Sequence, residues 1–213
     1  MDTIAQAIFT FTIFIIFATF HEYAHGWMAN RLGDSTAKRS GRLTLNPIAH
    51  IDIFWTIILP AMILISSGGR FAFGSAKPVP VNPYWLNKPK KDMIWVGLAG
   101  PSTNIAWSLI FIILMKSGLF SPASPVYLLF FICMYINIIL LVFNMIPIPP
   151  LDGSRVVEGL LPDKYAEEYS KIGRYGFLIL MGLMFFGILG RLFSFVIYLI
   201  MIIFSLSLPL RGF

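Results

Sequence analysis

The chain has 213 residues, of which 57% are hydrophobic and 12% are charged, and its mean hydropathy is +0.79. Soluble domains carry about 25% charged residues, so this composition excludes an ordinary soluble protein and indicates one that is embedded in a lipid bilayer. The net charge of +6 does not indicate nucleic-acid binding, because the basic residues lie in short loops between apolar runs. Such loops are typical of the cytoplasmic side of a membrane protein, where they lie beside anionic lipids.

The apolar runs predict an all-α polytopic membrane protein with about five or six transmembrane helices, since each crossing needs about 20 apolar residues. The runs that are long enough to cross are residues 4–29, 93–114, 126–146, 172–189 and 192–208. A helix with alternating charge, Pro162–Lys171, is expected at the surface. We expect a single membrane-embedded domain over residues 1–213. Its core would be residues 1–153, and the surface helix and the last two spans would follow in residues 154–213.

A shorter apolar run, Ile53–Ser66, has Pro60 near its middle. As a helix it would be only about 21 Å long, against a hydrocarbon core of about 30 Å. If this segment crossed the bilayer, the basic residues would be divided six to ten between the two faces, which is hardly a bias. If it is re-entrant, only Lys116 and Arg191 lie opposite the other basic residues, as the positive-inside rule expects. We therefore expect a re-entrant segment and an amino terminus outside, while a tilted short helix in a thinned bilayer is the alternative.

The first apolar run ends in a sequence with metal-ligand spacing, His21-Glu22-Tyr23-Ala24-His25. In a helix, positions i and i+4 lie on one face, so both imidazoles can reach one metal ion. An H-E-x-x-H helix is typical of zinc hydrolases, in which Glu22 would take a proton from a water at the metal. The alternative is a chance pattern of polar surface residues. Ionisable groups beside a membrane span are costly, however, and usually mark a functional site.

Two histidines leave a zinc ion one protein ligand short, and Asp152 is the best candidate for the third. It follows a proline-rich stretch, Pro147–Pro150, which ends the preceding apolar helix because proline lacks a backbone donor. Irregular backbone at membrane depth is tolerated only where it lines a cavity, and Gly153 lets the chain turn beside the carboxylate. The alternative is that Asp152 merely caps a helix that begins near Ser154.

At these residues the chain resembles a known family, the site-2 proteases, which are intramembrane zinc metalloproteases. Besides the H-E-x-x-H helix, the resemblance rests on the stretches Gly41–Pro47 (GRLTLNP), Ala76–Asn82 (AKPVPVN), Gly97–Asn104 (GLAGPSTN) and Asn144–Gly153 (NMIPIPPLDG). It looks most like the short bacterial subgroup, which lacks PDZ and CBS domains. One departure is Ile53-Phe54-Trp55, where the family pattern has a proline and a glycine near these positions, and it concerns the shape of this loop and not the zinc ligands.

The resemblance implies one zinc ion per chain, bound by His21, His25 and Asp152, with Glu22 as the general base. It implies a multi-pass enzyme of the bacterial cytoplasmic (inner) membrane, acting in regulated intramembrane proteolysis. The substrate would be a membrane protein, cut in or near its transmembrane segment. The resemblance also suggests that Asn144 holds the substrate backbone, although an asparagine in a membrane often makes a helix–helix hydrogen bond instead. We expect the bilayer and the substrate as partners and no nucleic acid, and the sequence leaves the oligomeric state open.

Three other residues are weaker candidates for the site. Asn104 is expected to pack its span against neighbouring helices. His50 is expected to lie in an interfacial loop. The second interpretation is that it lines the site or serves as an alternative ligand. Cys133 is expected to fill space between helices.

Other functions remain open at this point. A transporter or channel could use His21, Glu22 and His25 to handle protons or metal ions, and it would pass metal without cleaving anything. An inactive relative could bind membrane helices without cutting them, but it would be expected to lose Glu22 or a ligand. A metalloprotease that cuts prenylated peptides is a third alternative, but such enzymes typically use a glutamate where this chain has Asp152.

Overall fold

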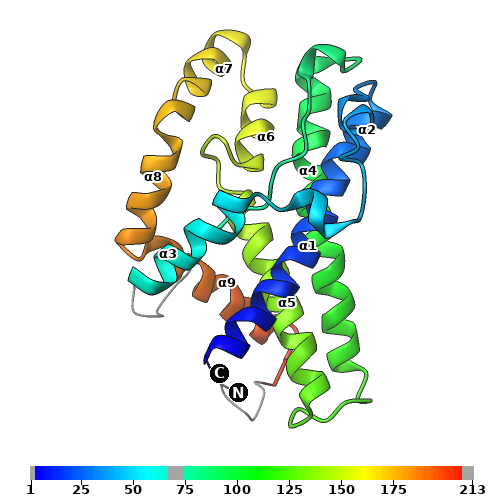
Figure 1. Ribbon diagram of the computed structural model, residues 1–213, viewed down its shortest axis with the longest axis vertical. Helices are drawn as coiled ribbons and strands as arrows, with labels where there is room; N and C mark the ends of the chain where they lie inside the picture. Colours follow the sequence, from blue (N-terminus) through cyan, green and yellow to red (C-terminus); the bar gives the residue numbers. More distant parts are fainter. Residues whose placement is uncertain (1–2, 67–73, 208–213) are drawn as a thin grey trace. The chain divides into compact units, whose positions relative to one another are not determined.

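The computed structural model describes residues 3–66 and 74–207. The regular elements in these residues are all helices, without a strand, which confirms the predicted all-α class. The chain divides into two compact units, Met1–Asp92 and Met93–Phe213. Figure 1 labels the helices of both units, and each unit is described by itself below.

The first unit is built on helix α1, Thr3–Arg31, which carries the H-E-x-x-H sequence. Shorter elements follow it: α2 (Thr36–Arg39), η1 (Pro47–His50), η2 (Ile53–Ile58), α3 (Leu59–Ser66) and η3 (Pro83–Trp85). Both α2 and η1 contact α1. The stretch that departs from the family pattern begins η2, a π-helical turn whose first N–H groups are capped by Asp52. η2 and α3 together form a short apolar helix with the predicted bounds, 53–66, and whether it crosses or re-enters the bilayer stays a prediction.

Two residues after the end of helix α1, Gly33 terminates the helix with a positive φ of +111°. The N–H of Asp34 donates to the carbonyl of Ala29 at 2.9 Å, and the N–H of Gly33 donates to that of Asn30 at 3.5 Å, as in a Schellman motif. A Cβ at Gly33 would lie 2.8 Å from the carbonyl oxygen of Trp85. Glycine is therefore required here by the backbone angle and by the close approach of the later loop.

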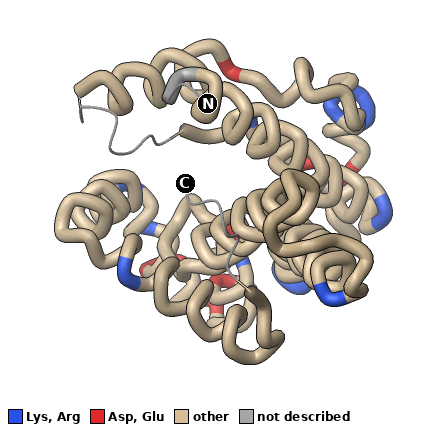
Figure 2. Tube along the Cα trace, turned by 90° about the horizontal axis from the view of Figure 1, so that it is seen from below, with Lys and Arg blue, Asp and Glu red and all other residues tan. Residues whose placement is uncertain are grey.

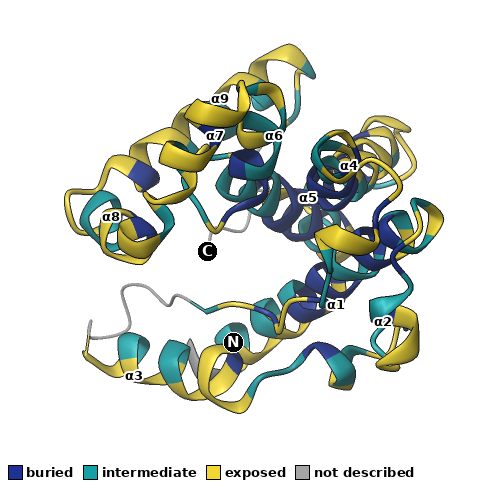
Figure 3. Cartoon of the chain, turned by 90° about the horizontal axis from the view of Figure 1, so that it is seen from above, coloured by how far each residue is buried: buried dark blue, intermediate teal, exposed yellow. Residues whose placement is uncertain are grey.

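The described part of the second unit contains α4 (Pro89–Lys116, which begins in the last residues of the first unit), α5 (Pro125–Asn144), α6 (Asp152–Leu160), α7 (Asp163–Ser170), α8 (Gly173–Phe185) and α9 (Ile188–Ile203). α4 and α5 are joined by a hydrogen bond from Asn104 Nδ2 to Asn137 Oδ1 at 3.0 Å, which confirms the packing expected of Asn104. α5 also contacts α9. Figure 3 shows much of α5 as buried, whereas α8 and α9 are largely exposed.

The chain between α5 and α6 is irregular because it contains the predicted proline-rich stretch. Close contacts on both sides fix its path. A Cβ on Gly153 would clash with the backbone of Met145, and a Cβ on Gly176 would clash with the carbonyl oxygen of Pro149. Two glycines therefore let α6 and α8 pack directly against this connection. Asp152 follows it as the first residue of α6.

Three described helices, α1, α4 and α5, are each long and apolar enough to cross a bilayer, and each matches a predicted run. Figure 2 shows charged residues confined to short stretches of the trace, with most of the long helices uncharged. The two predicted C-terminal spans differ from the structure, because α8 and α9 have only 13 and 16 residues and are bent by 69° at the break between them. The break falls at Gly187, which takes a left-handed φ of +69°, and not at Gly190 and Arg191. Together α8 and α9 could form a fourth span, and the count of five or six stays a prediction.

Candidate metal centre

Two histidine side chains lie side by side on helix α1. His21 and His25 are both 4% exposed, and their Nε2 atoms are 3.0 Å apart. The rings are nearly perpendicular, at 80°. Two imidazole nitrogens bound to one tetrahedral zinc ion lie about 3.3 Å apart, since each Zn–N distance is about 2.0–2.1 Å. The helix therefore gives this pair, four residues apart, nearly the spacing that two ligands of one zinc ion need.

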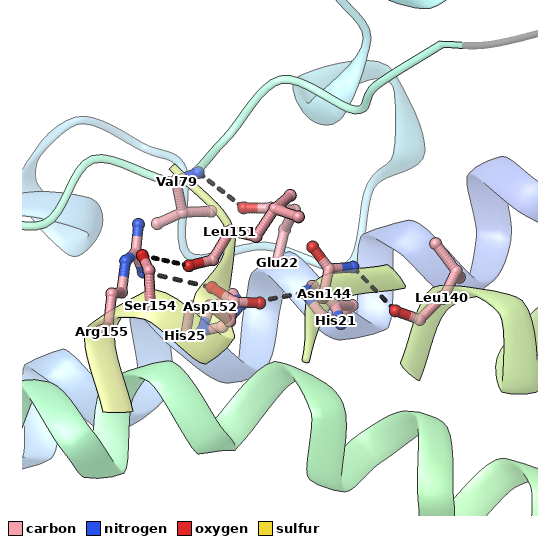
Figure 4. A network of polar contacts seen from close by, with 10 residues as sticks. All are labelled: His21, Glu22, His25, Val79, Leu140, Asn144, Leu151, Asp152, Ser154 and Arg155. Carbon is pink, nitrogen blue, oxygen red and sulfur yellow. Dashed lines mark hydrogen bonds and ion pairs between the residues drawn. The ribbon is translucent and has the colours of Figure 1, made fainter. Parts of the chain in front are cut away.

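The carboxylate of Glu22 is held at one oxygen by a distant part of the chain. Its Oε2 accepts a hydrogen bond from the backbone N–H of Val79 at 2.8 Å (Figure 4). Its other oxygen, Oε1, accepts no hydrogen bond from the described residues of the first unit. Val79 belongs to the non-helical segment Ser75–Asn82, which we name the strap. A half-buried carboxylate with one oxygen fixed and the other open suits a general base.

Asp152 is the first residue of α6, in the second unit, and it is 6% exposed. Leu151 occupies the N-cap position, so Asp152 does not cap this helix. Arg155 Nη1 lies 3.5 Å from Asp152 Oδ1 (Figure 4), and the positive end of the helix dipole adds to this favourable field. A Cβ on Gly97 of α4 would lie 3.1 Å from the carbonyl oxygen of Asp152, so α4 packs closely against this turn. The second unit thus fixes one buried carboxylate.

The weaker candidates have local partners. Asn144 Nδ2 donates to the carbonyl of Leu140 at 2.9 Å, within its own helix (Figure 4), and its role in substrate binding stays a prediction. The sequence predicts an interfacial loop for His50, but in the structure it is the last residue of the 3-10 helix η1. It is 1% exposed and therefore interior, with Nε2 2.9 Å from the carbonyl oxygen of Thr44. Cys133 is buried, in keeping with its predicted packing role.

Sequence reasoning missed the contacts that hold the strap. Arg42 Nη2 donates to the carbonyl oxygens of Lys77 at 2.9 Å and Pro78 at 3.3 Å. Arg42 lies in the GRLTLNP stretch, and the two carbonyls lie in the AKPVPVN stretch. Both stretches carried the family resemblance, and that was the only signal of their pairing.

Comparison with known proteins adds to this geometry. The model of Peptidase family M50 matches residues 120–184. YwhC of Bacillus subtilis, which carries the name of a proposed zinc metalloprotease, is 37% identical over 176 residues, which are 78% of this chain and 75% of that protein. Rip2 of Mycolicibacterium smegmatis, named in the same way, is 29% identical over 179 residues, which are 84% of this chain and 67% of that protein. No solved structure matches the chain significantly.

The long apolar helices, the H-E-x-x-H sequence on α1 and these matches define the class of protein, which is a membrane metalloprotease. The chain belongs to peptidase family M50, the site-2 protease family. The family assignment made from the sequence is therefore confirmed.

Proposed function

We propose that the chain is an intramembrane zinc metalloprotease that hydrolyses a peptide bond in or near the transmembrane segment of a membrane-protein substrate. The observation that carries the proposal is the buried pair of His21 and His25, with Nε2 atoms 3.0 Å apart, on a helix apolar enough to cross a bilayer. Glu22 lies beside the pair on the same helix. The names of YwhC and Rip2 support zinc as the metal.

Asp152 is the third ligand in this proposal, with one zinc ion per chain. Two buried imidazoles and a buried carboxylate are the donor types of catalytic zinc sites, which keep a fourth position for water or substrate. Zinc bound there would polarise the scissile carbonyl and lower the pKa of a water molecule. Arg155 and the N-terminus of α6 place positive charge beside the Asp152 carboxylate, and a carboxylate binds metal in its deprotonated form.

Glu22 moves the protons of the reaction. Since the N–H of Val79 occupies Oε2, the open oxygen Oε1 accepts the proton from the attacking water and then delivers it to the leaving amine. A carboxylate that is already oriented does not have to be ordered during the reaction. The chain thus supplies both proton-transfer steps from one side chain.

The substrate has to unwind locally before it can be cut. The carbonyls of a transmembrane helix are hydrogen-bonded within the helix, so an intact helix does not offer them to a nucleophile. We place the enzyme in the bacterial cytoplasmic membrane with the site towards the cytoplasmic side. We also place it in regulated intramembrane proteolysis, in which a partner or an earlier cut of the substrate would control access.

Co-expression with a panel of single-span membrane proteins tests the proposal. Wild type is expected to cleave at least one of them, and Glu22→Gln is expected to cleave none. Glu167→Gln is the control and should cleave as many as wild type, because Glu167 is an exposed carboxylate on α7. Equal cleavage by wild type and Glu22→Gln would contradict the proposal. Zinc uptake into vesicles without cleavage by wild type would favour a transporter instead.

A further inference from the structure

The strap, Ser75–Asn82, packs directly against helix α1 beside Glu22. Val79 of the strap is 6% exposed, and its Cγ1 atom lies 2.9 Å from the position that a Cβ of Gly26 would take. Gly26 comes one turn after Glu22 on α1. Because Gly26 has no Cβ, the strap lies close enough to the helix for the N–H of Val79 to reach Glu22 Oε2. The contact with Glu22 is thus supported by packing as well as by a hydrogen bond.

The peptide group between Pro78 and Val79 has a charged partner on each side. Its N–H donates to Glu22 Oε2 at 2.8 Å, and its carbonyl oxygen accepts a hydrogen bond from Arg42 Nη2 at 3.3 Å. The same Nη2 donates to the carbonyl of Lys77 at 2.9 Å. A guanidinium at the carbonyl polarises the peptide group and makes its N–H a better donor, since linked hydrogen bonds strengthen one another. Arg42 therefore acts on Glu22 through one peptide group.

Other residues hold the parts of the strap that lie before and after this peptide group. The N–H of Asn82 donates to Oδ2 of Asp34 at 2.7 Å, and Asp34 has no exposed surface. The N–H of Lys77 donates to the carbonyl of His50 at 2.8 Å. These contacts hold residues on both sides of the Pro78–Val79 peptide. Arg42 is the charged side chain, among the described residues of the first unit, that holds the peptide contacting Glu22.

We propose that Arg42 is a positioning residue for the general base. It holds the Pro78–Val79 peptide so that its N–H fixes Oε2 of Glu22 and leaves Oε1 directed to the attacking water. This inference rests on the proposed function, in which Glu22 is the general base. A glutamate side chain has several rotatable bonds, and without this contact its carboxylate would spend part of the time in unproductive orientations. The expected consequence of losing Arg42 is a lower kcat with little change in KM.

Hydrogen exchange at the Val79 amide tests the structural half of this inference without any substrate. Proline has no backbone N–H, so Val79 supplies the only exchangeable backbone hydrogen in residues 78–80. Arg42→Gln is expected to accelerate its exchange about tenfold, which is roughly what one hydrogen bond to a charged group is worth. Glu22→Ala, which removes the acceptor, should accelerate it similarly. Arg39→Gln is the matched control, because Arg39 is an exposed guanidinium at the end of α2, three residues before Arg42, and lies over the ring of Trp85, 5.2 Å from its centroid.

Kinetics with the best-cleaved single-span reporter of the panel test the catalytic half. Arg42→Gln is expected to lower kcat about 10- to 100-fold and to change KM less than about twofold. This loss of kcat does not exceed the loss that is typical of removing a general base. Arg42→Lys should recover part of kcat, because an ammonium can still donate to one of the two carbonyls. The zinc content and the midpoint of thermal unfolding of Arg42→Gln should equal those of Arg39→Gln.

Each result decides between this role and its rivals. A higher KM with unchanged kcat would overturn the inference and make the strap a substrate-holding segment. Loss of zinc or of thermal stability in Arg42→Gln, without rescue by Arg42→Lys, would also overturn it and leave a structural role only. Wild-type exchange at Val79 in Arg42→Gln would overturn it whatever the kinetics. If Glu22→Gln abolishes cleavage while Arg42→Gln cleaves normally, this inference fails alone, whereas full cleavage by Glu22→Gln would remove the proposed function itself.

Discussion

The side chain of Asn104 donates a hydrogen bond to the side chain of Asn137 at 3.0 Å, and neither residue has any exposed surface. Asn137 in turn donates to the carbonyl of Cys133, one turn earlier on α5, at 2.8 Å. A polar pair inside two apolar helices fixes how α4 and α5 pack, because each amide would be costly to bury alone.

The pair should therefore behave as a unit. Asn104→Ala is expected to lower the free energy of unfolding by about 1–2 kcal/mol, because it leaves the buried Asn137 oxygen unpaired. Asn137→Ala should do the same, and the double variant should cost about 0.6–1.7 kcal/mol less than the sum of the two. Denaturation in detergent measures the cycle, with the exposed Ser102 of α4, changed to alanine, as control. Strictly additive losses would show that the hydrogen bond contributes nothing.

Metal content tests the proposed ligands separately from activity. Purified wild type should contain near-stoichiometric zinc, and His21→Ala and Asp152→Ala should lose most of it, because a site with two protein ligands binds zinc weakly. His50→Gln should keep its zinc, since this buried histidine is bonded to the carbonyl of Thr44. Elemental analysis after gel filtration measures all four proteins. Full zinc occupancy in Asp152→Ala would remove Asp152 from the site.

Two glycines after helix α1 should differ in how well they accept a side chain. At Gly41, with φ +67°, a Cβ would meet nothing within 4 Å, so Gly41→Ala should cost only the left-handed strain of about 1–2 kcal/mol. At Gly33, with φ +111°, a Cβ would also lie 2.8 Å from the carbonyl oxygen of Trp85. Gly33→Ala should therefore lower the thermal unfolding midpoint more than Gly41→Ala. Equal shifts of the unfolding midpoint would mean that Trp85 and its neighbours move away from the new Cβ.

The part of the site that depends on local geometry could be predicted from the sequence. His21 and His25 approach each other because a helix brings residues four apart onto one face, and a long, predominantly apolar run made that helix predictable. The contact of Glu22 with Val79 joins residues 57 apart, and nothing local to either residue encodes it. The burial of His50 likewise depends on how its loop folds back on the unit, which its own neighbours in the sequence do not determine.

The difference between local sequence and tertiary packing also explains why the break between the C-terminal helices was predicted at the wrong place. Both Gly187 and Gly190 can interrupt an apolar run, and composition favoured the position next to the charged Arg191. In the structure Gly187 takes the left-handed conformation, whereas Gly190 continues helix α9. A glycine permits a break without requiring one, so the packing of the finished fold decides which glycine is used. The three longer spans needed no such decision and were predicted.

The topology of Ile53–Ser66 gives a prediction that does not depend on catalysis. If the segment is re-entrant, cysteines at Lys38 and Lys88 should both react with an impermeant reagent from the cytoplasmic side, because this keeps nearly all basic residues on one face. A cysteine at Ser121 should react only from the opposite side. Cys133 is first replaced by alanine. Labelling of Lys38 and Lys88 positions from opposite sides would make the segment a true crossing.

Cleavage by the purified protein in lipid vesicles tests the central claim most directly, with a single-span substrate reconstituted beside it. Wild type with zinc should cut the substrate, lose activity when a chelator removes the metal, and regain it when zinc is returned. Glu22→Gln should keep the zinc and the fold, since its amide oxygen can still accept from Val79, but it should cut at least about 100-fold more slowly because an amide cannot take up the proton. Near-normal turnover by zinc-loaded Glu22→Gln would contradict the mechanism.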